Sequence, residues 1–81
     1  LLKFQLDFGH GEKRQILSGI AEFYPDFEQL VGKKVLAVTN LKPRKIRGEI
    51  SNGMLLSSED DEGHVKLAIV GPEHENGSLI G

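Results

Sequence analysis

The stretch "LLKFQLDFGHGEKRQILS" (residues 1–18) decides the fold, because it contains two strand patterns joined by a turn. Its first half alternates polar side chains with the apolar ones of Leu2, Phe4, Leu6 and Phe8. An alternation with a period of two is typical of a half-buried β-strand. The glycines of "GHG" tolerate the positive φ angles of a hairpin turn, and "KRQILSGI" suits the return strand. The sequence therefore predicts an antiparallel hairpin at the start of the chain.

The next segment, "EFYPDFEQLVGKK" (22–34), is expected to form one short helix. Pro25 and Asp26 suit a first helical turn, and Gly32 can end the element. Phe27, Leu30 and Val31 lie at helical spacing, which supports this expectation.

Three further strands are expected at 33–40, 53–58 and 64–70. A charged turn, "EDDEG", separates the last two. The stretch 42–53 is expected to be a loop or a bulged strand, because Pro43 cannot donate a hydrogen bond to a ladder. Leu79 and Ile80, near the end of the chain, are expected to pack back onto the strands. About five short strands with one short helix favour an all-β fold, a small and partly open barrel, as a single domain over residues 1–81.

Charge is divided unevenly along the chain, although the whole chain has a net charge of only -2. Residues 1–47 hold nine Lys and Arg against five Asp and Glu, a net of +4. Residues 48–81 hold one against seven, a net of -6. The pI of about 5.9 argues against indiscriminate binding to polyanions, but a local positive face is compatible with it.

No arrangement of residues in the sequence is typical of a catalytic or metal site. His10, His64 and His74 lack the spacing of a zinc site, and the chain has no cysteine. The serines have no nucleophile-elbow context, and the run 59–62 is too short for a calcium loop. We therefore expect no enzyme activity, no metal, no cofactor and no small-molecule substrate.

The composition also bears on the compartment. No apolar run approaches the roughly 20 residues that span a membrane, so no membrane association is expected. The absence of cysteine fits a reducing compartment, and we expect a cytoplasmic location.

Four of the ten basic residues fall within six positions of "NLKPRKIRGEISNGM" (40–54): Lys42, Arg44, Lys45 and Arg47. Such a cluster can neutralise phosphates and release counterions, which gives affinity for nucleic acid without sequence preference. Asn40 and Ser51 add neutral hydrogen-bonding groups, and Met54 could contact a base or ribose. On these grounds alone, a solvated loop explains the charges equally well. Lys3 and Arg14, on the polar faces of the first two predicted strands, would extend a positive face toward this segment.

The order of "QILSGIAEFYP", "VGKKVLAVTNLKPRKIRG" and "SNGMLL" resembles the tRNA-binding domain found at the C-terminus of many bacterial methionyl-tRNA synthetases. The same domain occurs in free-standing tRNA-binding proteins, in a phenylalanyl-tRNA synthetase subunit and in a synthetase-associated cytokine precursor. The similarity extends across essentially all 81 residues. It implies an oligonucleotide-binding (OB) barrel, recognition of the general shape of tRNA, and a homodimer.

The chain departs from the pattern of this family in two places. Family members usually carry a further N-terminal strand with an Arg-Val-Gly-type motif ahead of the position of Leu1. We therefore expect the N-terminal strand to be missing and an unpaired strand edge to be exposed. Asn52 stands where the family often has an acidic residue or Gln, which affects local loop contacts only.

The resemblance assigns tRNA contacts to the residues of this sequence that match its motif: Asn40, Lys42, Arg44, Lys45, Arg47, Ser51 and Met54. Lys3 and Arg14 are a possible additional RNA face. The leading hypothesis is a non-catalytic tRNA-binding module appended to methionyl-tRNA synthetase. The alternatives are a module that chiefly forms homodimers, and a free-standing, chaperone-like relative with weak RNA binding.

Overall fold

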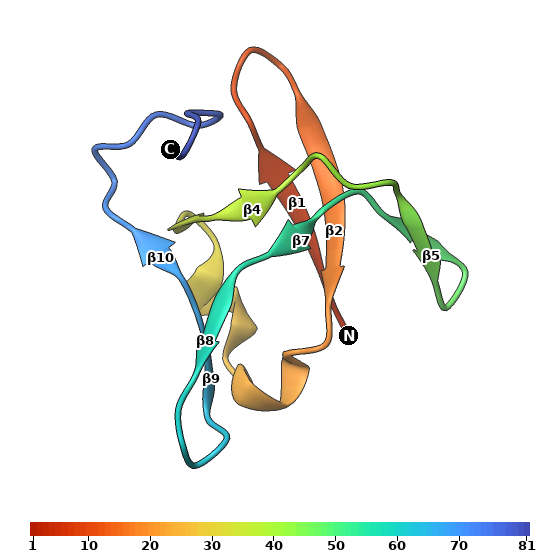
Figure 1. Cartoon of the computed structure of the whole chain (residues 1–81), viewed down its shortest axis with the longest axis vertical. Helices are drawn as coiled ribbons and strands as arrows, with labels where there is room; N and C mark the ends of the chain where they lie inside the picture. The colour runs from red at the N-terminus through yellow and green to blue at the C-terminus, as the bar shows by residue number, and fades with distance from the viewer.

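The computed structural model describes all residues from Leu1 to Gly81 and begins with the predicted hairpin. Strands β1 (Leu2–Asp7) and β2 (Lys13–Ser18) pair antiparallel in six register positions, from Leu2 opposite Ser18 to Asp7 opposite Lys13. Burial alternates along β1 as the sequence predicts. Gly9, His10 and Gly11 in the turn all have positive φ. The first hairpin is therefore confirmed (Figure 1).

The helix expected over 22–34 is replaced by two short 3₁₀ turns, η1 (Ala21–Phe23) and η2 (Phe27–Leu30). The i, i+3 spacing of Phe27 and Leu30 fits a 3₁₀ turn as well as an α-helix. The chain leaves helical geometry at Val31, which is extended (φ -63°, ψ 130°), and Gly32 follows with a φ of 88°. Of the three apolar residues at helical spacing, Leu30 packs against the core, whereas Phe27 is 49% and Val31 is 84% exposed.

The predicted strand over 33–40 is divided into β3 (Lys34–Val35) and β4 (Ala37–Val38). It changes partner at Leu36: β3 pairs with β10 (Ile69–Val70), whereas β4 pairs with β7 (Met54–Leu55). The backbone oxygen of Leu36 accepts a hydrogen bond from the Leu56 amide at 3.0 Å, which bridges the break.

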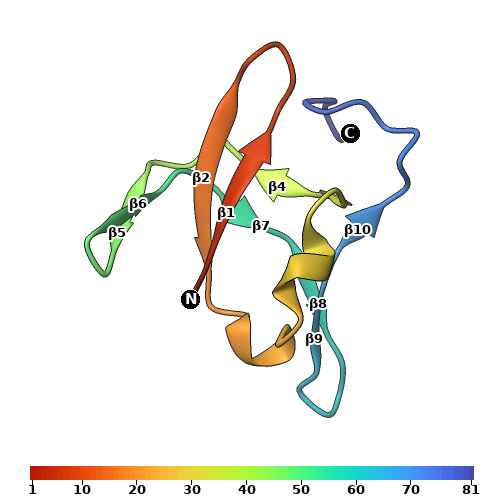
Figure 2. The ribbon, with the colours of Figure 1, turned by 180° about the vertical axis from the view of Figure 1, so that it is seen from behind.

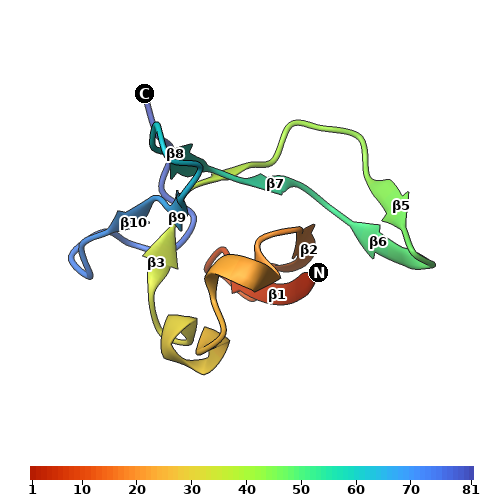
Figure 3. The same ribbon diagram turned by 90° about the horizontal axis from the view of Figure 1, so that it is seen from below.

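Two further hairpins project from the body of the chain (Figure 1, Figure 2). One consists of β5 (Arg44–Ile46) and β6 (Glu49–Ser51), and the other of β8 (Ser57–Glu59) and β9 (Val65–Leu67). The radius of gyration, 12.8 Å, exceeds the roughly 12 Å that a chain of this length has on average. Seen from below in Figure 3, the turn of hairpin β5–β6 points away from the body, whereas the far end of β6 is hydrogen-bonded to β2.

The core is small and centres on the return strand of the first hairpin. Ile16 is fully buried and clusters with Ile20, Leu55 and Leu67. Gly53 must be glycine here, because its φ is +138° and a Cβ would lie 2.9 Å from both Ile16 Cδ1 and the Val38 oxygen. Because only six residues are buried, the core has few contacts, and the close approach of the Gly53 backbone to Ile16 is one of them.

The ten strands pair two by two, and no continuous ladder closes them into a barrel. The chain is thus mostly β with almost no helix, as predicted, and OB-type closure stays a prediction. β1 pairs with β2 alone, so its other edge is unpaired, as expected. That edge lines a groove of about 970 Å³, together with η2, β3 and residues 74–78. No helical segment is long and apolar enough to cross a membrane.

The C-terminal segment returns to the first hairpin, but not through its apolar residues. Gly77 lies directly against the Phe8 carbonyl group, and the His74 backbone oxygen accepts a hydrogen bond from Lys34 Nζ. Leu79 and Ile80 are 97% and 70% exposed, so the prediction that they pack back onto the strands is wrong. A backbone contact at a glycine holds this segment instead.

Candidate nucleic-acid interface

The basic segment, expected to be a loop or a bulged strand, forms a regular β-hairpin. Three pairs form its ladder: Arg44 with Ser51, Lys45 with Ile50, and Ile46 with Glu49. Arg47 and Gly48 make the two-residue turn and both have positive φ, 50° and 82°. Two positive φ values are the signature of a tight hairpin turn whose twist matches that of the strands. Pro43 stands before the first paired residue, where no ladder hydrogen bond is required of it.

The cations of this hairpin point to more than one side. Residues directly opposite each other share a face of a ladder, and successive residues alternate between faces. Arg44 therefore lies on the face of Ser51 and Glu49, Lys45 lies on the opposite face with Ile50, and Arg47 is at the tip. The hairpin presents positive charge on both faces and at its end.

None of the four clustered cations has a partner within the chain. The side chains of Lys42, Arg44, Lys45 and Arg47 are exposed and take part in no ion pair and no side-chain hydrogen bond. Exposed cations without internal partners remain available for phosphate oxygens. Their arrangement on a protruding hairpin makes them accessible from several directions.

The return limb of the hairpin is anchored firmly to β2. Ser51 is 4% exposed, and its Oγ accepts a hydrogen bond from the Leu17 amide at 3.0 Å and donates to the Gly53 oxygen at 3.2 Å. Gln15 Nε2 donates to the Ile50 oxygen at 2.9 Å, and the Asn52 amide donates to the Gln15 oxygen at 2.8 Å. β6 therefore has a fixed position beside the first hairpin.

This anchoring changes how Ser51 is interpreted. The sequence places it among the tRNA contacts, but the fold buries its hydroxyl and uses it both as an acceptor and as a donor. One acceptor site of the hydroxyl is unused, but with Ser51 only 4% exposed a ligand would reach it only if the surrounding packing opened. The hydrogen bonds of Ser51 therefore indicate that its hydroxyl group fixes the position of the hairpin and does not contact a ligand.

Asn40 and Met54 lie at the base of the hairpin. Asn40 is exposed in the outgoing limb, just after β4. Met54 is the first residue of β7 and is 50% exposed, opposite Val38. Both side chains are near the base of the cationic hairpin and are open to a ligand that reaches it.

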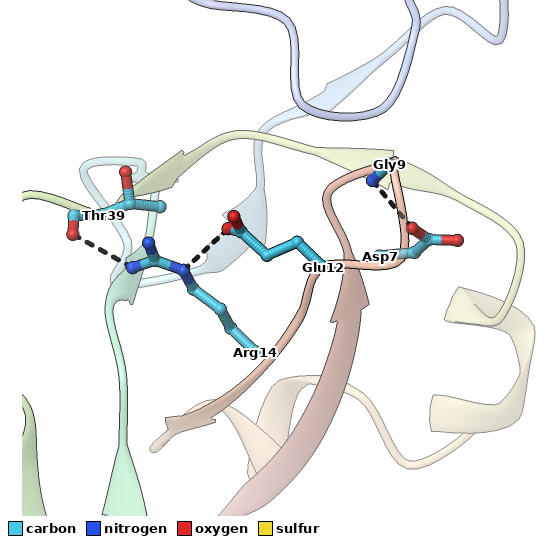
Figure 4. A network of polar contacts seen from close by, with 5 residues as sticks. All are labelled: Asp7, Gly9, Glu12, Arg14 and Thr39. Atoms are coloured by element: carbon cyan, nitrogen blue, oxygen red, sulfur yellow. Dashed lines mark hydrogen bonds and ion pairs between the residues drawn. The ribbon is translucent and has the colours of Figure 1, made fainter.

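The two additional candidates, Lys3 and Arg14, already have partners. Lys3 Nζ lies 2.7 Å from Glu49 Oε1, so this ion pair joins β1 to β6. Arg14 Nε lies 3.2 Å from Glu12 Oε2, and Arg14 Nη1 donates to the Thr39 oxygen at 3.1 Å (Figure 4). Compared with the clustered cations, both have charge that is partly compensated within the chain.

Sequence reasoning missed three residues that shape this interface: Gln15, Glu49 and Ile50. Gln15 anchors β6 and is paired with Gln5 through its side-chain oxygen at 3.0 Å. Ile50 is 49% exposed beside Lys45, so an apolar side chain stands among the cations. The alternation of polar and apolar residues in "RGEISNG" carries the signal for β6, but three residues are too few to predict a strand.

The acidic turn 59–63, which connects β8 to β9, is stabilised by one of its own carboxylates, that of Asp60. Asp60 Oδ1 accepts hydrogen bonds from the amides of Glu62 and His64, each at 2.9 Å. The bond from the His64 amide lowers the pKa of Asp60 below its ordinary value of 3.8. No group of three or more His, Cys, Asp or Glu side chains is arranged to hold a metal ion.

Comparison with known proteins gives consistent matches over nearly the full chain. The sequence profile of a family described as "Putative tRNA binding domain" matches residues 1–79. The chain is 61% identical over 80 residues to the methionine–tRNA ligase of Lactiplantibacillus plantarum, and 58% identical over 80 residues to that of Enterococcus faecalis. Each match covers 99% of this chain but only 12% of the relative, so the chain spans about an eighth of the length of these relatives.

A solved structure has the same fold. The crystal structure of a MetRS-related protein from Pyrococcus horikoshii matches with a TM-score of 0.88 and 43% sequence identity. The match covers 98% of this chain and 71% of that chain.

Proposed function

The chain belongs to the tRNA-binding domain family, and we propose accordingly that it is a non-catalytic module that binds tRNA through hairpin β5–β6. The observation that carries the proposal is the set of four exposed, unpaired cations on a hairpin that protrudes from the body. Phosphate contacts of this kind fix the position of a protein on RNA without reading its bases. Scarce aromatic residues, 6% of the chain, also favour recognition of shape and phosphate over base stacking.

The division of the cations between two faces favours one binding geometry. A flat positive surface would contact one backbone, whereas a hairpin with Arg44 on one face, Lys45 on the other and Arg47 at the tip can lie between two backbones. Folded RNA offers such places in its grooves and where helices meet. We therefore assign the contacts to Lys42, Arg44, Lys45 and Arg47, with Asn40 and Met54 at the base of the hairpin.

The relatives suggest the setting of this module. We propose that the chain is the C-terminal appended domain of a cytoplasmic methionyl-tRNA synthetase, since the relatives that it matches are methionine–tRNA ligases. A second binding site on the same polypeptide raises the local concentration of tRNA near the catalytic region. The contribution of the module is therefore avidity, and the chemistry belongs to the rest of the enzyme.

The test is tRNA binding as a function of salt. If about four phosphates are neutralised, log K should fall with log salt at a slope of roughly -3 to -4. The double variant Arg44→Gln/Lys45→Gln should reduce the steepness of this slope by about 1.4 to 1.8. The control, Lys33→Gln/Lys66→Gln, removes the same charge outside the hairpin and should leave the slope unchanged. Equal slopes for the two double variants would exclude hairpin β5–β6 as the binding element.

A second candidate function is self-association, which exposed apolar side chains favour. Met54, Leu56 and Ile69 are 50%, 41% and 47% exposed, and the Leu56 oxygen accepts a hydrogen bond at 3.0 Å from the amide of Ala68, next to Ile69. Apolar side chains grouped in this way are typical of subunit contacts. We propose that these residues support a homodimer, which would link two synthetase subunits. Sedimentation over a dilution series tests this: a single monomeric species at micromolar concentration would exclude it.

A further inference from the structure

Arg14 has an arrangement of contacts unlike that of any other cation in the chain. It lies on β2, and its side chain is only 25% exposed. Its guanidinium group contacts the Glu12 carboxylate and donates to the Thr39 backbone oxygen (Figure 4). It also lies 5.5 Å from the centre of the Phe8 ring. The Glu12 carboxylate and the Phe8 ring set the direction of the guanidinium plane, and the Thr39 carbonyl oxygen accepts a hydrogen bond from one of its N–H groups.

The Thr39 carbonyl group is a significant partner because Thr39 begins the segment that leads into the cationic hairpin. Residues 39–43 form this outgoing limb, which connects β4 to β5. The return limb has hydrogen bonds to β2 at Ile50, Ser51 and Asn52. The outgoing limb has one hydrogen bond to the body of the chain, the bond from Arg14. Apart from the ladder that joins β5 to β6, the outgoing limb is thus attached to the body through a single side chain.

We propose that Arg14 is a positioning residue for tRNA binding, which fixes the outgoing limb of hairpin β5–β6 and does not itself contact RNA. This proposal rests on the proposed function of that hairpin. With Arg14 in place, the hairpin is held in the orientation in which its cations meet phosphates. Binding therefore costs less conformational entropy. Without this bond, the charge of the hairpin is unchanged but its direction is less fixed.

The alternative is that Arg14 is a phosphate contact, and the structure gives reasons against it. Its charge is compensated by Glu12 at 3.2 Å, whereas the four hairpin cations have no acidic partner. Its side chain is also the less exposed member of the Arg14–Glu12 pair, at 25% against 55%. The two roles make different predictions for a lysine at position 14. Lysine keeps the charge but lacks the planar fork that holds a carboxylate and a carbonyl group at once.

The experiment compares Arg14→Lys and Arg14→Gln with Lys13→Gln, a neighbouring exposed cation of β2. Two quantities are measured on the full chain: the affinity for tRNA over a salt series, and amide hydrogen exchange of residues 39–48 in the free protein. A positioning role predicts that both Arg14 variants lose affinity by about threefold to tenfold, the value of one hydrogen bond. Their salt slopes should equal that of the unmodified chain, and exchange in residues 39–48 should become faster. Lys13→Gln should change neither quantity.

The opposite pattern would overturn the proposal. If Arg14 contacts a phosphate, Arg14→Lys keeps most of the affinity, Arg14→Gln makes the slope shallower by about 0.7 to 0.9, and exchange in the free protein is unchanged. If Arg14→Gln does not fold, Glu12→Gln provides the second variant, because it frees the guanidinium group while leaving the Thr39 bond possible. That variant should accelerate exchange in residues 39–48 to a smaller degree, and unchanged exchange would count against the proposal.

The exchange measurement also separates this proposal from the proposed function. If the hairpin cations prove irrelevant to tRNA, the binding role of Arg14 falls with them, although faster exchange would still show that it holds the outgoing limb. If the cations matter but both Arg14 variants exchange normally, the positioning role alone is excluded.

Discussion

Hairpins β5–β6 and β8–β9 are built alike, with three residues paired against three, but one is basic and the other acidic. In the acidic hairpin, Asp60 is used internally and accepts hydrogen bonds from the amides of Glu62 and His64 to close the turn. In the basic hairpin, Arg47 and Gly48 close the turn through backbone geometry alone, and every clustered cation is left without a partner. Internal hydrogen bonding thus gives one acidic side chain, that of Asp60, a structural role, whereas none of the four clustered cations has such a role.

The two hairpins also differ at their glycines, where substitution should have the strongest consequence. Gly53, at the base of the basic hairpin, has positive φ and no space for a Cβ, whereas Gly63 in the acidic turn has φ +82° and open space around it. Gly53→Ala should lower the free energy of unfolding by about 2–4 kcal/mol through strain and overpacking. Gly63→Ala should cost only about 1 kcal/mol, from backbone strain. Chemical denaturation measures both, and equal losses would show that the base of the basic hairpin is not tightly packed.

The second-largest effect on stability is expected from removal of the buried Ser51 hydroxyl group. Ser51→Ala should destabilise the chain by about 1–3 kcal/mol, because the Leu17 amide loses its acceptor. Ser58→Ala on exposed β8 is the control and should stay within about 0.5 kcal/mol of the unmodified chain. If Ser51→Ala weakens tRNA binding without changing stability, then Ser51 contacts the RNA, and the interpretation of its hydroxyl as structural is wrong.

Neutralising one charged side chain in each hairpin compares the effect of the basic hairpin on tRNA affinity with that of the acidic one. Lys45→Gln removes one free cation and should lower tRNA affinity by about fivefold, with a salt slope shallower by about 0.7 to 0.9. Asp61→Asn removes an exposed negative charge from the acidic hairpin and should raise affinity by less than about twofold, because screening weakens distant charges. Titrations at two salt concentrations measure both. An effect of Asp61→Asn as large as that of Lys45→Gln would mean that net charge, not the hairpin, determines binding.

The weakest effect concerns acid stability. The lowered pKa of Asp60 means that its ionised form is favoured in the folded state, so its contribution to stability is present above pH 3.8 and is lost as the pH falls through the pKa of the folded protein. Asp60→Asn should therefore lower the unfolding midpoint slightly at pH 7, and the difference should shrink as the pH falls below 3.8. Asp61→Asn, again the control, should show no such trend. A difference that persists undiminished in acid would assign the effect to the turn rather than to the charge.

The parts of the fold that the sequence predicts are those that depend on local pattern. The alternation from Leu2 to Phe8 and the glycines after it specify the first hairpin within a few residues, and the structure confirms it. The acidic turn is predictable as well, because its neighbours are recognisable strands. These features depend on residues that are close in the sequence, so a single chain suffices to find them.

The parts that the sequence does not predict depend on contacts between distant residues. Hairpin β5–β6 resembles a loop in the sequence because Pro43 and the charges hide two strands of three residues each. The burial of Ser51 is equally hidden, because nothing in its neighbours indicates that it lies beside Leu17, 34 residues earlier. The same limit applies to Arg14, whose partner Thr39 is 25 residues away. The cationic cluster itself is visible in the sequence, but its separation into two faces requires the register.

The core draws nothing from residues 42–50. All the buried residues lie outside this segment: Ile16, Leu17, Ile20, Ser51, Leu55 and Leu67. The segment that carries the charge thus adds no buried side chain to the core, and it is held to the body by polar contacts at Thr39, Glu49 and Ile50. Changes of charge at its exposed positions can therefore alter the affinity of the module without disturbing the core packing.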